Sequence, residues 1–90
     1  MKPIRLSAHA LGYASKRGFT EAEVEEAIRS CPWQPAELGR LECTKSFPFN
    51  REWNGKAYAT KRVRPIFLEE ADEIVVVTVY TYYSRKEMSL

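Results

Sequence analysis

The chain has 90 residues, of which 44% are hydrophobic and 29% charged, and this composition predicts one globular domain over residues 1–90. No apolar run approaches the roughly 20 residues that a membrane-spanning helix needs, and Lys2 and Arg5 lead into no segment long enough for a signal peptide. The formal net charge of +2 is unremarkable, so we expect a cytoplasmic protein that does not associate with membranes.

The sequence gives little support to metal or cofactor chemistry. Cys31 and Cys43 are the only cysteines, they do not form a CxxC pair, and the single histidine, His9, is far from both in sequence. A structural zinc site takes about four such ligands at characteristic spacing. We therefore expect no metal, no cofactor and two reduced thiols, with a disulfide between them as the alternative.

The chain begins with signals for a short strand and a helix. Residues 4–6 are suited to an extended start, and Ser7 follows with the side chain of a helix N-cap. This pattern predicts a first helix from Ala8 to Lys16 or Arg17, stopped by Gly18 in the left-handed conformation. Gly12 lies inside this helix at a cost of about 1 kcal/mol relative to alanine, and its missing side chain would allow close approach to a sheet.

The second helix has the clearest local signal. Thr20-Glu21-Ala22-Glu23 is a capping box, in which the Thr20 and Glu23 side chains each accept from the other's backbone amide. An apolar stripe with helical spacing predicts the face that meets the core: Val24, Ala27, Ile28 and Cys31. Pro32 ends the helix, and the following loop carries Trp33, which is either a lid on the core or a binding residue.

From Arg40 the periodicity changes to two, which is the spacing of a strand. Pro48 cannot donate to a ladder and indicates an edge strand or a strand end. Asn54-Gly55 is the preferred centre of a type I′ hairpin turn. A second strand begins at Lys56, and we expect a bulge or break in it at Pro65.

Residues 74–83 form an almost unbroken run of β-branched and aromatic residues. Such a run predicts a strand that is central in its sheet and covered on both faces, because a half-exposed strand would alternate with polar residues. A polar tail is expected from Ser84 onward. The predicted fold is therefore α+β: two N-terminal helices packed on one face of a three- to four-stranded antiparallel sheet.

Cations concentrate in residues 40–64, whereas acids concentrate in the second helix and in residues 69–73, which suggests a basic sheet and an acidic helix. Arg62 and Arg64 lie two apart on a predicted strand, so both project to the same face as Tyr58. Two guanidiniums on one face are a candidate anion site, since each planar fork binds two phosphate oxygens at once. A solvated sheet face is the alternative.

A second group of candidate functional residues lies on the first helix. His9 would lie there with Tyr13, and with Lys16 and Arg17 one turn further on. A histidine near tyrosine and arginine suits general acid–base catalysis or RNA contact. The alternative is a histidine that makes a local hydrogen bond and packs its ring on the sheet.

Five stretches of the chain together carry a pattern: Ser7-Ala8-His9-Ala10, Arg17-Gly18-Phe19-Thr20, Val24-Glu25-Glu26-Ala27-Ile28, Lys61-Arg62-Val63-Arg64-Pro65-Ile66-Phe67 and Val77-Thr78-Val79-Tyr80. This pattern resembles a bacterial family known only as a domain of unknown function. That family is similar to the RelE/ParE and BrnT toxin group, small α+β proteins with two helices followed by an antiparallel sheet. The resemblance implies a RelE-like fold. It also implies a link to messenger RNA, which several members of the group cleave, often on the ribosome, until a partner antitoxin neutralises them.

Two hypotheses of different class therefore stand. In the first, the chain is a RelE- or BrnT-like protein that binds or cleaves RNA, with RNA, the ribosome and an antitoxin-like protein as partners. Metal-free cleavage needs a deprotonated 2′-hydroxyl, a neutralised phosphate and a protonated leaving oxygen. The residues assigned to catalysis are His9, Arg62, Arg64 and Tyr80, and those assigned to RNA contact are Tyr13, Lys16, Arg17, Tyr58 and Lys61. In the second, the chain is a non-catalytic module that binds a protein partner or forms a homodimer.

Overall fold

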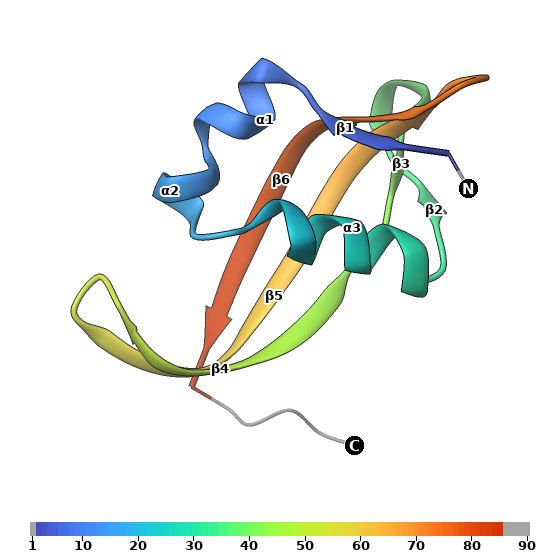
Figure 1. The fold of residues 1–90 in the computed structure, drawn as a ribbon. Helices are drawn as coiled ribbons and strands as arrows, with labels where there is room; N and C mark the ends of the chain where they lie inside the picture. The colour runs from blue at the N-terminus through green and yellow to red at the C-terminus, as the bar shows by residue number, and fades with distance from the viewer. Residues whose placement is uncertain (1, 86–90) are drawn as a thin grey trace.

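The computed structural model describes residues 2–85, in which N-terminal helices contact a mixed, mostly antiparallel sheet of six strands (Figure 1). The elements in chain order are β1 (Ile4–Leu6), α1 (Ala8–Gly12), α2 (Ala14–Arg17), α3 (Glu21–Ser30), β2 (Gln34–Pro35), the 3₁₀ turn η1 (Glu37–Gly39), β3 (Leu41–Glu42), β4 (Lys45–Trp53), β5 (Lys56–Glu69) and β6 (Ile74–Ser84). The α+β class is as predicted, but the sheet has more strands than expected.

The first helical segment is interrupted. Ser7 caps it as predicted, accepting a hydrogen bond from the backbone amide of Ala10 at 3.1 Å. The expected single helix is split at Tyr13 into α1 and α2, and Gly18 ends α2 with φ of 79°. The expectation that Gly12 approaches the sheet closely is wrong, because a Cβ there would meet nothing within 4 Å.

The second predicted helix is confirmed as α3. Both hydrogen bonds of the capping box are present, from the Glu23 amide to Thr20 Oγ1 at 3.1 Å and from the Thr20 amide to Glu23 Oε1 at 3.0 Å. Val24, Ala27 and Ile28 are buried, so the predicted stripe faces the core.

The sheet order is β1-β6-β5-β3-β2, and β4 also pairs with β5. The prediction that residues 74–83 form the central strand is wrong, because β5 holds that place. β1 lies parallel to β6, with Ile4 opposite Ile74 and Leu6 opposite Val76, so the sheet is not purely antiparallel. Since β1 ends at Leu6, β6 has no strand partner on that side from Val77 onward among the described residues.

A bulge or break was predicted at Pro65; no break occurs, and the irregularity lies next to Pro65 rather than at it. β5 runs continuously through Pro65, which pairs with Val79. The register shifts one step later, between Ile66 and Phe67, and the extra residue lies in β6. The Pro65 carbonyl accepts from the Cys43 amide at 3.4 Å, so the missing N–H of this proline faces the gap between β3 and β4, where no ladder requires it.

The hairpin between β4 and β5 is as predicted. Asn54 and Gly55 have φ of 52° and 80°, and two positive values in succession are the requirement of a type I′ turn. Among the described residues β4 pairs only with β5, and it carries Pro48, so the proline lies in an edge strand, one of the two predicted places.

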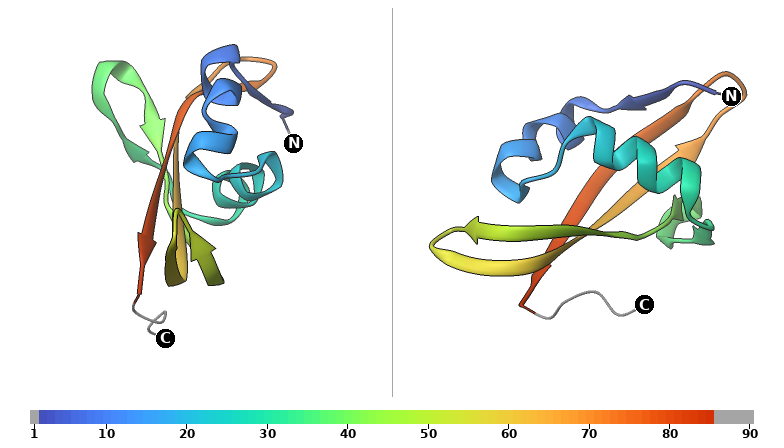
Figure 2. Two further views of the ribbon diagram at one scale, coloured as in Figure 1. Left: turned by 90° about the vertical axis from the view of Figure 1, so that its left-hand side faces the viewer. Right: turned by 60° about the horizontal axis from the view of Figure 1, so that its bottom comes forward.

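The helices cover only one face of the sheet. The left view of Figure 2 shows them on one side, while the segment over residues 34–42 projects from the other. The core between helices and sheet consists of Leu6, Ala10, Phe19, Val24, Ala27, Ile28, Cys43, Val63, Phe67, Ile74, Val76 and Val79. On the other face, Tyr80 and Tyr82 are 37% and 46% exposed. The prediction that β6 is covered on both faces is therefore wrong.

Within residues 2–85, no helix is long and apolar enough to cross a membrane. Both cysteines are free thiols; Cys43 is buried, and this burial raises its pKa to about 12. Ser84 still belongs to β6, and the polar tail predicted after it lies, from residue 86 onward, outside the described residues.

Candidate functional site

A band of aromatic rings, interleaved with the guanidiniums of two arginines, runs from α1 around the edge of β6 to the uncovered face of the sheet. We call it the cation–aromatic band, and its members in spatial order are His9, Tyr13, Arg17, Tyr80, Arg64 and Tyr82. The Arg17 guanidinium carbon lies 4.1 Å from the Tyr13 ring centre and 5.0 Å from that of Tyr80. The Arg64 guanidinium carbon lies 5.1 Å from the centre of the Tyr80 ring.

Arg17 lies at the edge of the sheet and connects the helix part of the band, at Tyr13, with the strand part, at Tyr80. Its Nη1 donates to the Val79 carbonyl at 2.8 Å and to Thr78 Oγ1 at 3.3 Å. Its own carbonyl accepts from Thr81 Oγ1 at 2.5 Å and from the Tyr83 hydroxyl at 2.9 Å. Arg17 thus fills the edge that β1 leaves open, and its charge cancels part of the strand's unpaired carbonyl dipoles.

Tyr80 occupies the middle of the band, in contact with two guanidiniums. Each such contact is typically worth about 0.5–1 kcal/mol at an exposed site. The Tyr80 side chain is more than one-third exposed, and no described residue hydrogen-bonds its hydroxyl. The Tyr80 phenol thus lies between two guanidiniums, those of Arg17 and Arg64. A phenol is a group that can transfer protons, and a guanidinium is a group that can bind phosphate.

The two strand arginines differ in their pairing. Arg64 Nη1 lies 3.6 Å from Glu42 Oε2, and its Nε is buried without a hydrogen-bond partner among the described residues. Arg62 is exposed on the same face, directly opposite Tyr82 in the ladder, and no described acid pairs with it. Arg62 is therefore the more available cation, and Arg64 the more fixed.

His9 lies at the far end of the band. Its ring centre is 4.9 Å from that of Tyr13, at an interplanar angle of 60°. Lys16 lies on the same side, with Nζ 5.8 Å from the Tyr13 ring centre. Tyr13, Arg17 and Tyr80 separate His9 from Arg64, so the residues assigned to catalysis belong to one continuous surface but not to one cleft.

Two sequence-predicted RNA contacts do not join the band. Lys61 is only 3% exposed, and its Nζ donates to the Gly18 carbonyl at 2.8 Å and pairs with Glu23 at 2.8 Å. Tyr58 lies 5.4 Å from the Tyr83 ring, within an aromatic cluster that also holds Phe49 and Trp53. The expected two-residue alternation fails here because Thr60 and Lys61 are buried in succession.

A hollow of about 310 Å³ adjoins the band beneath η1. It is lined by Glu37, Leu38, Arg40, Glu42, Arg64, Ile66, Thr78 and Tyr80. Leu38 is 82% exposed and has φ of 60°, a left-handed conformation that is rare for a leucine. The sequence of the Glu37–Glu42 segment does not indicate a pocket, because a Leu-Gly pair after an acidic loop residue is common in proteins.

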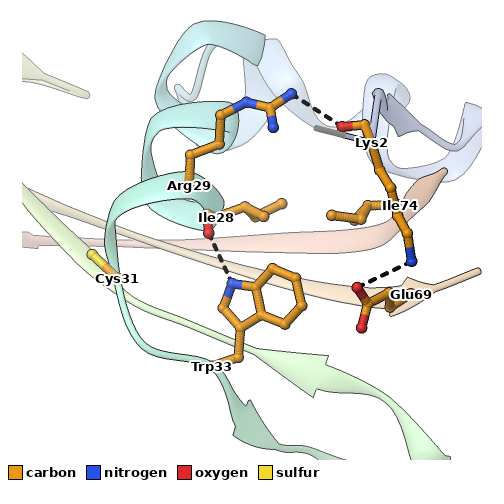
Figure 3. A pocket seen from close by; sticks show the side chains of 7 residues that line it. All are labelled: Lys2, Ile28, Arg29, Cys31, Trp33, Glu69 and Ile74. Atoms are coloured by element: carbon orange, nitrogen blue, oxygen red, sulfur yellow. Dashed lines mark hydrogen bonds and ion pairs between the residues drawn. The ribbon is translucent and has the colours of Figure 1, made fainter.

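A larger hollow of about 550 Å³ lies on the helix side (Figure 3). Figure 3 shows Trp33 closing it from below, with Ile28 and Ile74 behind and with Lys2 bonded to Glu69 at its rim. The Trp33 indole donates to the Ile28 carbonyl at 2.8 Å and meets Phe67 edge to face at 5.0 Å. Trp33 therefore packs on the buried Phe67, as expected of a lid on the core, and its exposed part lines the hollow.

No group of three or more His, Cys, Asp or Glu side chains among residues 2–85 is arranged to hold a metal ion. Comparisons of this chain with protein-family models, with curated proteins and with solved structures find no match.

Proposed function

We propose that the protein binds single-stranded RNA along the cation–aromatic band, as a small RNA-directed protein of the RelE and BrnT kind. The observation that carries this proposal is the contact sequence Tyr13–Arg17–Tyr80–Arg64, in which rings and guanidiniums alternate at 4.1, 5.0 and 5.1 Å. The likeness of the five sequence stretches to the toxin-related family supports it.

An alternating surface of this type matches the chemistry of a single strand. Guanidiniums bind phosphate oxygens in pairs, and exposed rings stack on unpaired bases at about 1–3 kcal/mol each. A duplex would hide its bases from the rings, so it would use only the charges. Tyr82, at the end of the band, is exposed, and the exposed Arg62 lies opposite it on β5, so Arg62 extends the same surface beyond the band.

Cleavage would place the scissile phosphate beside Tyr80. Arg17 and Arg64 would neutralise the phosphate, and the Tyr80 hydroxyl would move a proton at the reacting oxygens. His9 lies beyond Tyr13 and would contact a neighbouring nucleotide. This assignment replaces Arg62 with Arg17 as the second phosphate ligand.

RNA binding is tested by fluorescence anisotropy with a labelled uridine-rich oligonucleotide at low salt. We expect the Arg62→Ala/Arg64→Ala variant to lose at least about tenfold in affinity, because each charge-assisted phosphate contact contributes about 1.5–3 kcal/mol. A charge-matched control is Lys2→Ala/Arg29→Ala, which removes two cations beside the helix-side hollow. Equal losses in both variants, or no binding by the natural chain, would refute the proposal.

Cleavage is tested with a fluorophore- and quencher-labelled RNA, with and without ribosomes. Tyr80→Phe keeps the ring but removes the hydroxyl, so we expect binding within about twofold of the natural chain and a loss of cleavage of about a hundredfold or more. An unchanged cleavage rate in Tyr80→Phe would exclude the tyrosine from proton transfer.

A protein-binding module is the second candidate, favoured by the exposed apolar groups on the uncovered face. Tyr82 is 46% and Leu38 is 82% exposed. Light scattering after size exclusion gives the oligomeric state, and an antitoxin-like protein would be an alternative partner. A homodimer that survives Arg62→Ala/Arg64→Ala, in a chain that binds no RNA, would favour this candidate.

A further inference from the structure

The hollow beneath η1 carries a polar arrangement that the band alone does not explain. Two carboxylates, Glu37 and Glu42, and two guanidiniums, Arg40 and Arg64, line it together with the Tyr80 ring. It adjoins the band at Arg64 and Tyr80, so a strand lying on the band would pass its entrance.

The Glu42 carboxylate is held in place but keeps its hydrogen-bonding capacity. Its Oε2 lies 3.6 Å from Arg64 Nη1, which is an ion pair too long to be a hydrogen bond. No described residue donates a hydrogen bond to either oxygen. The Glu42 side chain is 24% exposed and lines the hollow, so a ligand in the hollow can reach it.

The Arg64 side chain has a donor without an acceptor. Its Nε is buried, and no described residue accepts its proton. An unpaired buried donor costs about 1–3 kcal/mol, so the Arg64 guanidinium is only partly satisfied by its pair with Glu42. The hollow therefore combines two carboxylate acceptors, Glu37 and Glu42, with the guanidiniums of Arg40 and Arg64 within one concave surface.

From this arrangement we infer that the hollow is a recognition pocket for a guanine base of a bound RNA strand, an inference that rests on the proposed RNA-binding function. Guanine is the RNA base that presents two adjacent donors, N1–H and the 2-amino group, and a carboxylate accepts both in parallel. It also presents O6 and N7 as acceptors, for which a guanidinium is the preferred protein partner.

The other bases fit this site less well. Adenine and cytosine place a ring nitrogen acceptor beside their amino group, which a carboxylate repels, and uracil places its single N–H between two carbonyls. The volume of about 310 Å³ is at the lower end of the range of ligand pockets, so it suits one nucleotide rather than a longer segment. The Tyr80 ring, with the Arg64 guanidinium against it, supplies the stacking surface.

The test uses labelled uridine oligonucleotides whose central nucleotide is guanosine, adenosine, cytidine or uridine, with affinity measured by fluorescence anisotropy. We expect the natural chain to prefer the guanosine strand about tenfold, the discrimination of one bidentate base contact. Glu42→Gln should lose this preference and keep its affinity for the all-uridine strand, because an amide accepts at only one atom.

Glu37→Gln is the second variant, since Glu37 is exposed and its replacement does not disturb the Arg64 pair. Glu69→Gln, on the helix side, is the matched control and should retain the preference. Four equal affinities in the natural chain, or a guanosine preference that persists in both pocket variants, would overturn this inference while leaving RNA binding intact. Absence of binding to every strand would instead refute the proposed function itself.

Discussion

Lys61 is a buried cation whose partners come from the helix layer. Its side chain is 3% exposed, whereas that of its partner Glu23 is 21% exposed. Glu23→Gln would leave an ammonium without a counter-charge inside the protein, and we expect a loss of about 3 kcal/mol in the free energy of unfolding. Urea denaturation followed by tryptophan fluorescence measures this quantity.

Removing Lys61 instead of the Glu23 charge should cost less in the free energy of unfolding. Lys61→Met leaves Glu23 with access to water and with its capping hydrogen bond from the Thr20 amide, so the expected loss is about 1 kcal/mol. Equal losses for the two substitutions would show that the charge left behind does not determine the cost.

Two glycines make a matched pair with opposite expectations. Gly18 has φ of 79°, and a Cβ there would overlap the Tyr83 hydroxyl and lie 2.8 Å from the Trp53 ring. Gly18→Ala should therefore lower the free energy of unfolding by about 2 kcal/mol or more. Gly12→Ala lies in α1 with open space around it, so it should raise stability by about 0.5–1 kcal/mol. Thermal denaturation of both variants, followed by circular dichroism, tests the contrast.

At the scale of single elements, the features that the sequence predicts correctly are local ones. The capping box of Thr20, the N-cap at Ser7 and the turn at Asn54-Gly55 each depend on residues within a few positions, so the sequence contains the whole cause. The alternation on β5 was read only in part, since Arg62 and Arg64 share a face but Thr60 and Lys61 are buried together.

The features that could not be predicted depend on distant partners. β1 pairs in parallel with β6, which lies about 70 positions later in the sequence. A strand of three residues carries too little sequence information to predict that partner. A bulge or break was expected in β5 at Pro65, yet the strand continues through it because its missing N–H faces the gap at Cys43, and the register shift lies between Ile66 and Phe67. The uncovered face of β6 looked buried because apolar and aromatic residues occupy both of its faces.

The pairing of β1 with β6 is reinforced by an exposed ion pair that responds to pH. Arg5 donates two hydrogen bonds of 3.0 Å to the Glu73 carboxylate, and these hydrogen bonds lower the pKa of Glu73 below its ordinary value of 4.5. A lowered carboxylate pKa stabilises the folded chain above the ordinary value, and the contribution is lost as the pH falls through the folded-state pKa.

Glu73→Gln removes this dependence. We expect the melting temperature of the natural chain to fall more steeply between about pH 5 and pH 3 than that of the variant. Parallel slopes over this interval would show that the pair contributes nothing to the acid sensitivity. Near pH 7, added salt should narrow the difference between the two proteins, because an exposed pair is screened.

At the scale of the whole molecule, much of the charge that is segregated in the sequence is used in ion pairs within the fold. The acids of α3 pair with cations of the sheet, Glu23 with Lys61 and Glu26 with Lys45. The basic segment over residues 40–64 therefore presents fewer available cations than its composition suggests. Because the band also draws on α1, α2 and β6, its members could be proposed singly from the sequence, but their contact order could not.

If the proposed RNA binding holds, this distribution of charge predicts how the affinity depends on salt concentration. For single strands the slope of log K against log salt is about −0.7 for each phosphate neutralised, so few available cations should give a shallow slope. Arg62→Ala and Arg64→Ala should each reduce its magnitude by about 0.7. Lys61→Met removes a charge that is already paired inside the protein, and it should leave the slope unchanged. Titrations at several salt concentrations measure all three slopes. A reduction in Lys61→Met equal to that in the arginine variants would mean that net charge, and not the cation–aromatic band, attracts the RNA.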